Sequence, residues 1–456
     1  MLSFAGCAIP EPPAPEVALA SALPETTIIP DHFVEDSETG EMVIPDNWIK
    51  SFNDPELEAI IDEALQNNLN LQAAASQVES AGGLVTQAGA QLLPVVAASG
   101  EAAQTGYEGL SSTSSSNVGL SASWELDIWG RVRAEKSAAE AGLDETIANF
   151  EFARLSLKGQ TAKSWYTATE TTQQLKFAAE VTELYKKTLD IVSTKHEFGD
   201  ADMTDVHLAR ADLASAEERM RQLDGAHRAA IRSLELLLGR YPSAELEVSD
   251  EFVPVPPSVP AGLPSELLER RPDLIAAERR VAQAFNLTTA AKAARLPTLS
   301  LSVAGGASNS QLTSLLGAGD TFWNAGANFM GPIFTGGALA AQVDIRNAQQ
   351  EGTLAQYGQQ ALVAFGEVET ALTNETLLKE RAAFLESVVE NNQSAVTLAQ
   401  DKYNAGAIEL LNLLQIQARL INSKVAFISL QNSRLTERIN LHLALGGDFS
   451  SAEPQP

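Results

Sequence analysis

The chain contains an internal repeat, and this repeat limits the folds open to it more than any other feature. Residues 70–74 (NLQAA) match residues 273–277 (DLIAA), 203 positions later. Gly199 and Gly239 match Gly406 and Gly446, each 207 positions later. The sequence therefore predicts one structural unit that is used twice in tandem.

Proline-rich stretches mark the borders of the two copies. Five prolines lie between 254 and 264, and six lie between 10 and 30; such stretches act as extended spacers. We expect a signal-peptide remnant (1–6), a Pro-rich tether (7–45), a first repeat (46–241), a Pro-rich connection (242–264), a second repeat (265–447) and a tail (448–456). Within the repeats we expect helices at 54–92 and 265–295, β-hairpins at 93–129 and 296–334, and long helical hairpins at 130–240 and 337–445.

Each repeat contains a segment that is almost free of charge and alternates with period 2. Residues 296–343 carry a single charged residue, Asp320. In 118–128, apolar residues from Val118 to Ile128 alternate with small or polar ones. This alternation predicts strands with one apolar face, and runs of about ten residues have the length of membrane-spanning strands. Two amphipathic hairpins on a soluble core remain the alternative.

The number of strands limits what one chain can build. A sheet that spans a bilayer must close, because an open edge leaves backbone groups unpaired in hydrocarbon. Closed membrane barrels start at about 8 strands, and one chain offers four. If the strands cross a membrane, the protein is therefore an obligate oligomer.

The proline-free stretches 95–241 and 333–453 predict long helices. Residues 131–198 would form about 100 Å of helix. After Gly199, apolar residues recur every seven positions in two series that start at Val206 and Ala209, which is typical of a coiled-coil seam. We expect two antiparallel helical hairpins that reverse at Gly199 and Gly406.

Composition excludes several classes of protein. The 59 acidic and 31 basic residues give a formal net charge of −28, which disfavours a nucleic-acid partner. One Cys and five His make a structural metal site improbable, and no apolar run is long enough for a transmembrane helix. We find no nucleophile motif and no phosphate loop, so we expect no enzyme activity and no soluble cofactor.

The single cysteine lies in the sequence Phe4-Ala5-Gly6-Cys7. Two small residues before a Cys near the N-terminus suggest a lipoprotein cleavage site. We therefore expect cleavage after Gly6, a covalent lipid on Cys7 and a natural start further upstream, because six residues are too few for a signal peptide. Ala8 favours sorting to the outer membrane.

Three motifs carry a resemblance to a known family. Residues 124–131 (WELDIWGR) resemble the signature that ends the first β-hairpin in the TolC family of outer-membrane factors, and residues 331–337 (GPIFTGG) resemble its counterpart in the second half. Residues 270–278 (RRPDLIAAE) resemble a helix start of the lipidated, OprM-like or NodT-type branch. The resemblance covers roughly residues 46–447.

This resemblance implies a mixed α and β membrane protein. It implies a homotrimer whose 12-stranded barrel lies in outer-membrane lipid and continues into a periplasmic α-helical barrel. The implied function is the exit duct of a tripartite efflux pump, with a periplasmic adaptor and an inner-membrane transporter, by family habit of the resistance-nodulation-division (RND) type. A soluble periplasmic coiled-coil protein remains the alternative.

The reversals of the helical hairpins hold the candidate site residues. Threefold repetition would turn the acids there into rings around the periplasmic mouth, and such rings favour cations. Helix capping is the competing interpretation, because acids suit a helix N-terminus. Gly199 and Gly406 would make the turns and contact the adaptor. The candidate gate residues are Glu197, Asp200, Asp202, Asp205, Asn404, Glu409 and Asn412.

Overall fold

The computed structural model describes residues 10–24, 26–34, 48–106, 113–257, 264–309 and 320–447. The chain forms two compact units. Unit 1 consists of Met1–Thr27, Ala75–Asn149 and Asp273–Ala361, and unit 2 of Ile28–Ala74, Phe150–Pro272 and Leu362–Pro456. The predicted signal-peptide remnant, Cys7 and the predicted tail lie outside the described residues.

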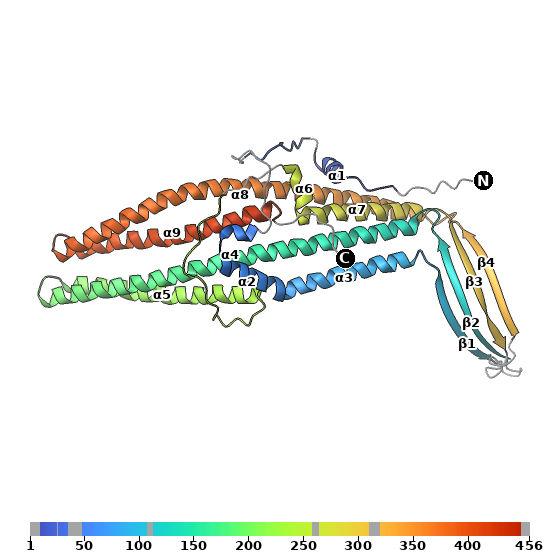
Figure 1. Ribbon diagram of the computed structural model, residues 1–456, viewed down its shortest axis with the longest axis horizontal. Helices are drawn as coiled ribbons and strands as arrows, with labels where there is room; N and C mark the ends of the chain where they lie inside the picture. Colours follow the sequence, from blue (N-terminus) through green and yellow to red (C-terminus); the bar gives the residue numbers. More distant parts are fainter. Residues whose placement is uncertain are drawn as a thin grey trace. The chain divides into compact units, whose positions relative to one another are not determined.

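Unit 1 contains a four-stranded antiparallel sheet in the order β1-β2-β3-β4 (Figure 1). Each repeat supplies one hairpin, and β2 pairs with β3 to join them. The predicted four strands are thus confirmed, including β1, whose alternation is weak. The strands are β1 (Val95–Thr105), β2 (Thr113–Leu126), β3 (Thr298–Asn309) and β4 (Asp320–Met330).

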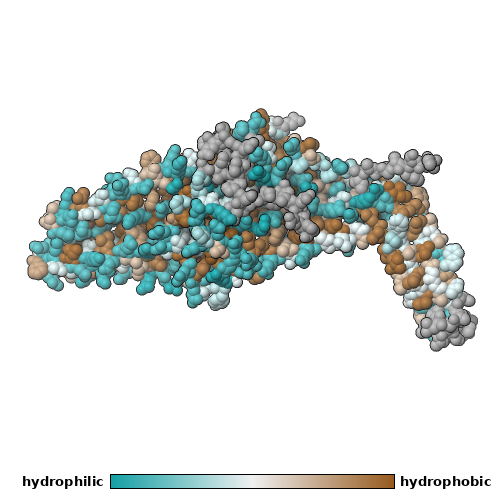
Figure 2. Space-filling view, in the orientation of Figure 1, coloured by the Kyte–Doolittle hydropathy of each residue, from teal (hydrophilic) through white to brown (hydrophobic). Residues whose placement is uncertain are grey.

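The register of the sheet builds one mainly apolar face. Leu120 lies opposite Gly305, which lies opposite Trp323, and Trp124 lies opposite Leu301. Directly paired residues point to the same side, so the face is continuous across β2, β3 and β4. Leu120 and Trp323 are 62% and 83% exposed. Figure 2 shows hydrophobic patches on the surface of the sheet.

Long helices extend from the strands. They are α3 (Leu69–Ala90), α4 (Arg131–Glu197), α7 (Pro272–Ala293) and α8 (Ala338–Asn404). The chain enters α4 directly after Trp129, whose indole N–H donates to the carbonyl of Pro297, 2.6 Å away. This bond fixes the junction of the two repeats just outside the sheet.

The N-terminal segment corrects one expectation. Residues 15–22, predicted as part of an extended tether, form the helix α1 (Pro15–Ala22). Pro15 suits the first helical turn, and the Ala and Leu residues that follow favour helix. Leu19 is buried, and a Cβ added at Gly358 of α8 would lie 2.9 Å from the Cβ of Ala22. The helix therefore packs on α8.

Unit 2 has an aromatic core around the short helices near the N-terminal end of the first repeat. These are η1 (Trp48–Phe52) and α2 (Pro55–Asn67), which pack with α4, α5 (Met203–Leu237) and α9 (Leu410–Ala444). Asp54 caps α2 by accepting from the Leu57 amide at 3.0 Å, and its other oxygen accepts from the Trp165 indole at 3.0 Å. The buried members include Trp48, Phe52, Leu57, Trp165, Tyr166, Leu234 and Ile439.

The connection between the repeats is held by a buried carboxylate. Glu235 of α5 is 2% exposed and accepts from the amides of Ala244 and Glu245 at 2.8 and 3.0 Å. Burial raises the pKa of Glu235, but these backbone hydrogen bonds outweigh it and hold the pKa below its usual value. The chain continues through η2 (Pro264–Glu266) and α6 (Leu267–Arg270) into the second repeat.

The repeat is visible where α5 and α9 end. Gly239 and Gly446 both adopt a left-handed conformation, with φ of 71° and 89°. A Cβ at Gly239 would lie 2.8 Å from the Asn67 carbonyl oxygen, and one at Gly446 would lie 2.9 Å from that of Arg270. Both positions therefore require glycine. None of the helices in the described part of the chain has an apolar stretch long enough to span a bilayer.

Candidate functional site at the hairpin turns

The two helical hairpins reverse through turns of the same design. Gly199 and Gly406 have φ of 81° and 73°. The amide of Asp200 donates to the Lys195 carbonyl at 2.8 Å, and the amide of Ala407 donates to the Lys402 carbonyl at 2.8 Å. Both turns are therefore Schellman motifs, which satisfy the last free carbonyls of a helix. We call residues 197–205 and 404–412 the two tip turns.

Asp202 is the N-cap of α5. Its carboxylate accepts from the amides of Asp205 and Thr204 at 3.2 and 2.6 Å, and these hydrogen bonds hold its pKa below the usual value. The predicted capping role is thus present for Asp202. Glu409 occupies the same position before α9, but its side chain makes no capping bond.

The predicted acids gather at the surface of the first turn. Glu197, Asp200 and Asp202 are exposed and Asp205 is half-buried. Among the described residues, no salt bridge involves any of these four acids. In the second turn the predicted residues Asn404, Glu409 and Asn412 are all exposed, and only Glu409 among them is charged.

An apolar cluster joins the two hairpins beside the tip turns. The first hairpin supplies Val192, Val206 and Ala209, and the second supplies Ala399, Tyr403, Leu410, Leu413 and Leu414. Val206 and Leu413 are equivalent positions of the repeat, and both are buried. The predicted coiled-coil positions Val206 and Ala209 therefore contact the other hairpin as well.

Lys195 is the residue that the sequence interpretation missed. Its ammonium group donates to the Tyr403 carbonyl at 2.8 Å and lies 4.2 Å from the centroid of the Tyr403 ring. Both contacts join the hairpins at the C-terminal end of α8, where the helix dipole favours a cation. A lysine in the last turn of both long helices, Lys195 and Lys402, was the available signal.

A metal or catalytic function has no support at the turns. Among the described residues, no group of three or more His, Cys, Asp or Glu side chains could hold a metal ion. His227, on the heptad, is half-buried, and its Nδ1 lies 3.4 Å from the hydroxyls of Thr171 and Thr172. It packs as expected for a coiled-coil position.

Comparison with known proteins identifies the family. The model of the family "Outer membrane efflux protein" matches residues 60–240 and 263–447. The chain is 33% identical to the pyoverdine export outer membrane protein OpmQ of Pseudomonas aeruginosa over 424 residues, which cover 89% of this chain and 88% of OpmQ. It is 31% identical to the antibiotic efflux pump outer membrane protein ArpC of Pseudomonas putida, covering 97% and 93%.

The fold agrees with these relatives. The outer membrane channel CmeC of Campylobacter jejuni superposes with a TM-score of 0.88 at 25% identity, covering 98% of this chain and 96% of CmeC. Four strands and long helices in two repeats confirm the predicted TolC-like fold. The soluble coiled-coil and enzyme alternatives are excluded by the family. The chain belongs to the outer membrane efflux protein family and is an outer-membrane efflux channel protein that extends into the periplasm.

Proposed function

We propose that three copies of this chain form the exit duct of a tripartite efflux pump, through which substrates pass to the cell exterior. The observation that carries this proposal is the four-stranded sheet with one continuous, exposed apolar face. Such a face suits lipid, and closure needs strands from more than one chain. Three copies would supply twelve strands.

The residues next to the sheet support this orientation in lipid. The indole N–H groups of Trp124 and Trp129 donate to the carbonyls of Leu92 and Pro297, at 2.9 and 2.6 Å, where the strands meet the helices. Tryptophans with a fixed polar edge are typical of the level of the lipid headgroups. Cys7 would carry the covalent lipid that anchors the chain to the same membrane.

The partners follow from the relatives and from the tip turns. ArpC is named as a part of an antibiotic efflux pump. We propose that the present chain likewise works with an inner-membrane transporter of the RND type and a periplasmic adaptor. The adaptor would contact the turns at Gly199 and Gly406, whose surroundings are open. We also propose that 46–241 and 265–447 are the two working repeats, joined by 242–264; the matched stretches 60–240 and 263–447 support this division.

The first tip turn would form the gate. In a trimer the acids Glu197, Asp200, Asp202 and Asp205 would repeat three times around the mouth, with Asn404, Glu409 and Asn412 beside them. Like charges repel, so a closed mouth needs contacts that hold it, and acid rings favour cations. The bridge from Lys195 to Tyr403 is one contact of the required kind.

Neutral amides at the gate acids test this proposal. Asn is as good an N-cap as Asp, so Asp202→Asn removes charge and keeps the cap. We expect the double variant Asp200→Asn/Asp202→Asn to be less cation-selective, or to conduct more at rest, in planar bilayers. Glu386→Gln, on an exposed part of α8, is the matched control. Unchanged selectivity and unchanged resting conductance would exclude the gate role.

The oligomeric state tests the duct itself. Light scattering of the detergent-extracted protein should give the mass of three chains of 48.5 kDa each. A monomer that stays in solution without detergent would contradict the proposal.

A further inference from the structure

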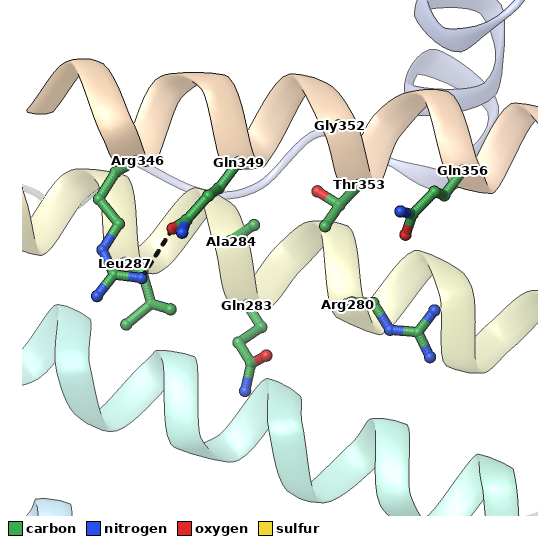
Figure 3. Close-up of a pocket in the computed structure, with 9 residues that line it drawn as sticks. All are labelled: Arg280, Gln283, Ala284, Leu287, Arg346, Gln349, Gly352, Thr353 and Gln356. Carbon is green, nitrogen blue, oxygen red and sulfur yellow. Dashed lines mark hydrogen bonds between the residues drawn. The ribbon is translucent and has the colours of Figure 1, made fainter.

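A cavity of about 400 Å³ lies between α7 and α8 in unit 1 (Figure 3). Five of the nine residues that line it carry side-chain nitrogen, and both helices supply them. The carboxylate of Glu145 binds Arg280 at the cavity. The residues that line the cavity are Arg280, Gln283, Ala284, Leu287, Arg346, Gln349, Gly352, Thr353 and Gln356.

The two guanidinium groups of the cavity differ in their partners. Arg280 donates twice to Glu145, at 3.0 and 2.8 Å, so its charge is balanced. Arg346 donates to the neutral carboxamide oxygen of Gln349 at 3.0 Å, and no carboxylate is within salt-bridge distance of it among the described residues. The cavity therefore holds one uncompensated positive charge in a chain with a net charge of −28.

The positions of the two arginines give the cavity its length. The Thr288 hydroxyl donates to the Arg346 carbonyl at 3.2 Å, so Arg346 lies level with Thr288 of α7. Arg280 is eight residues away along α7, or about 12 Å along the helix axis. Gln283 lies between them against Gly142 of α4, where a side chain on residue 142 would collide with its amide.

The cavity opens away from the N-terminal segment. Arg280, Gln283 and Leu287 lie on one side of α7, whereas Phe285, Thr289 and Lys292 lie on the other and line a second groove together with Pro10. In Figure 3 the N-terminal segment passes behind α8, on the side opposite to the viewer. In the proposed trimer this segment leads to the membrane anchor and lies outside the ring of helices. The opposite face, with the cavity, then lines the duct.

The charge belongs to the second repeat alone. At the positions 207 residues earlier, Ala139 and Gly142 correspond to Arg346 and Gln349. The first repeat therefore has neither an arginine nor a glutamine at these two positions of α4. A trimer would carry three such cavities.

We propose that this cavity is a binding site on the duct wall for solutes that carry a carboxylate or a phosphate. A guanidinium offers two parallel N–H donors to either group, and the carboxamide of Gln349, which accepts from Arg346, lies beside it with its own N–H donors. This proposal rests on the proposed exit duct. It specifies the solutes that the wall of the duct would bind, namely those with a carboxylate or a phosphate.

Block of the channel current tests the site. The full-length trimer is placed in a planar bilayer in potassium chloride, and citrate and inorganic phosphate are added in separate runs. We expect each probe to reduce the current with a measurable half-block concentration, and Arg346→Gln to raise that concentration about tenfold. Arg346→Lys keeps the positive charge but loses the two parallel N–H donors of the guanidinium. Its half-block concentration should therefore lie between those of the wild type and Arg346→Gln.

Matched variants separate the site from a general effect of charge. Lys292→Gln removes one positive charge from the other side of the same helix pair. Citrate and phosphate should block this variant at the same concentrations as the wild type. Gln349→Ala provides a second variant of the cavity, with weaker block expected. Equal block of the wild type, Arg346→Gln and Gln349→Ala would overturn the site but leave the duct intact. Loss of block in Lys292→Gln alone would do the same. A wild-type trimer that carries no current would instead overturn the duct, and the site with it.

Discussion

The ammonium group of Lys195 lies 4.2 Å from the ring centroid of Tyr403 and donates to the backbone carbonyl of the same residue. One side chain thus holds the ring and the backbone of the opposite hairpin. Burial, together with the nearby charge of Asp205, raises the pKa of the Tyr403 phenol. The ring therefore stays neutral under the cation, as a cation–π contact requires.

Removal of Lys195 should loosen the junction of the hairpins. Lys195→Ala loses a cation–π contact and a charge-assisted hydrogen bond, together about 1–2 kcal/mol at this partly exposed site. We expect faster hydrogen exchange of the amides around Val192 and Tyr403. Lys402→Ala is the control, because the Lys402 side chain has no partner among the described residues. Equal exchange in both variants would show that the bridge contributes nothing.

The four left-handed glycines at the ends of the helical hairpins, Gly199, Gly239, Gly406 and Gly446, should respond differently to alanine. A left-handed alanine costs about 1 kcal/mol wherever it stands. Gly199 and Gly406 have open surroundings, whereas Gly239 and Gly446 face a backbone carbonyl at 2.8 and 2.9 Å. Gly239→Ala and Gly446→Ala should therefore lower the midpoint of thermal unfolding much more than Gly199→Ala and Gly406→Ala. Four similar shifts would contradict this.

Asp54 should be essential for unit 2. Asp54→Ala removes the N-cap of α2 and leaves the buried indole N–H of Trp165 without its acceptor. The expected loss is about 3 kcal/mol, from the cap and from a hydrogen bond to a charged group. Near-ultraviolet circular dichroism during thermal unfolding would report it through Trp165. Glu56→Ala, an exposed acid in the same helical turn, should leave the transition in place.

The ionisation of Glu235 should make the stability of the folded chain depend on pH. Its pKa is lower in the folded chain than in the unfolded chain. Its stabilising contribution is therefore present above the unfolded pKa and is lost as pH falls through the folded pKa. We expect Glu235→Gln to be less stable than the wild type at pH 7, by about 1–3 kcal/mol.

As the pH falls below the unfolded pKa of about 4.3 this difference should begin to shrink, and it is lost once the pH has fallen through the lower, folded pKa, where position 235 is neutral in both proteins. Thermal unfolding of the two proteins between pH 7 and pH 3 measures it. A difference that does not change with pH would show that the Glu235 carboxylate charge makes no contribution.

Local patterns in the sequence predict the parts of the fold that depend on local rules. The alternation from Val118 to Ile128 gives the strand and its apolar face, and Gly199 and Gly406 give the turns. Asp202 lies just before α5, where an acidic residue is expected to cap the helix. Each of these follows from conformational preferences within a few residues.

Other features depend on residues that are far apart in the chain. Lys195 and Tyr403 are 208 positions apart, and their contact exists only after the two hairpins pack. Glu235 lies within a coiled-coil stretch, and its role depends on amides of the following connection. The predicted seam also drifts: Ile231 is buried in place of the expected Ala230, because a straight helix has 3.6 residues per turn rather than 3.5.

The strand order has a consequence for assembly. With β1 at one border of the sheet and β4 at the other, every copy offers two different free edges. When β1 of one copy pairs with β4 of the next, the contact is heterologous, and its rotation per copy decides whether a ring or an open filament results. Once such a ring has closed, no strand edge is left for a further copy, so growth ends without any capping protein.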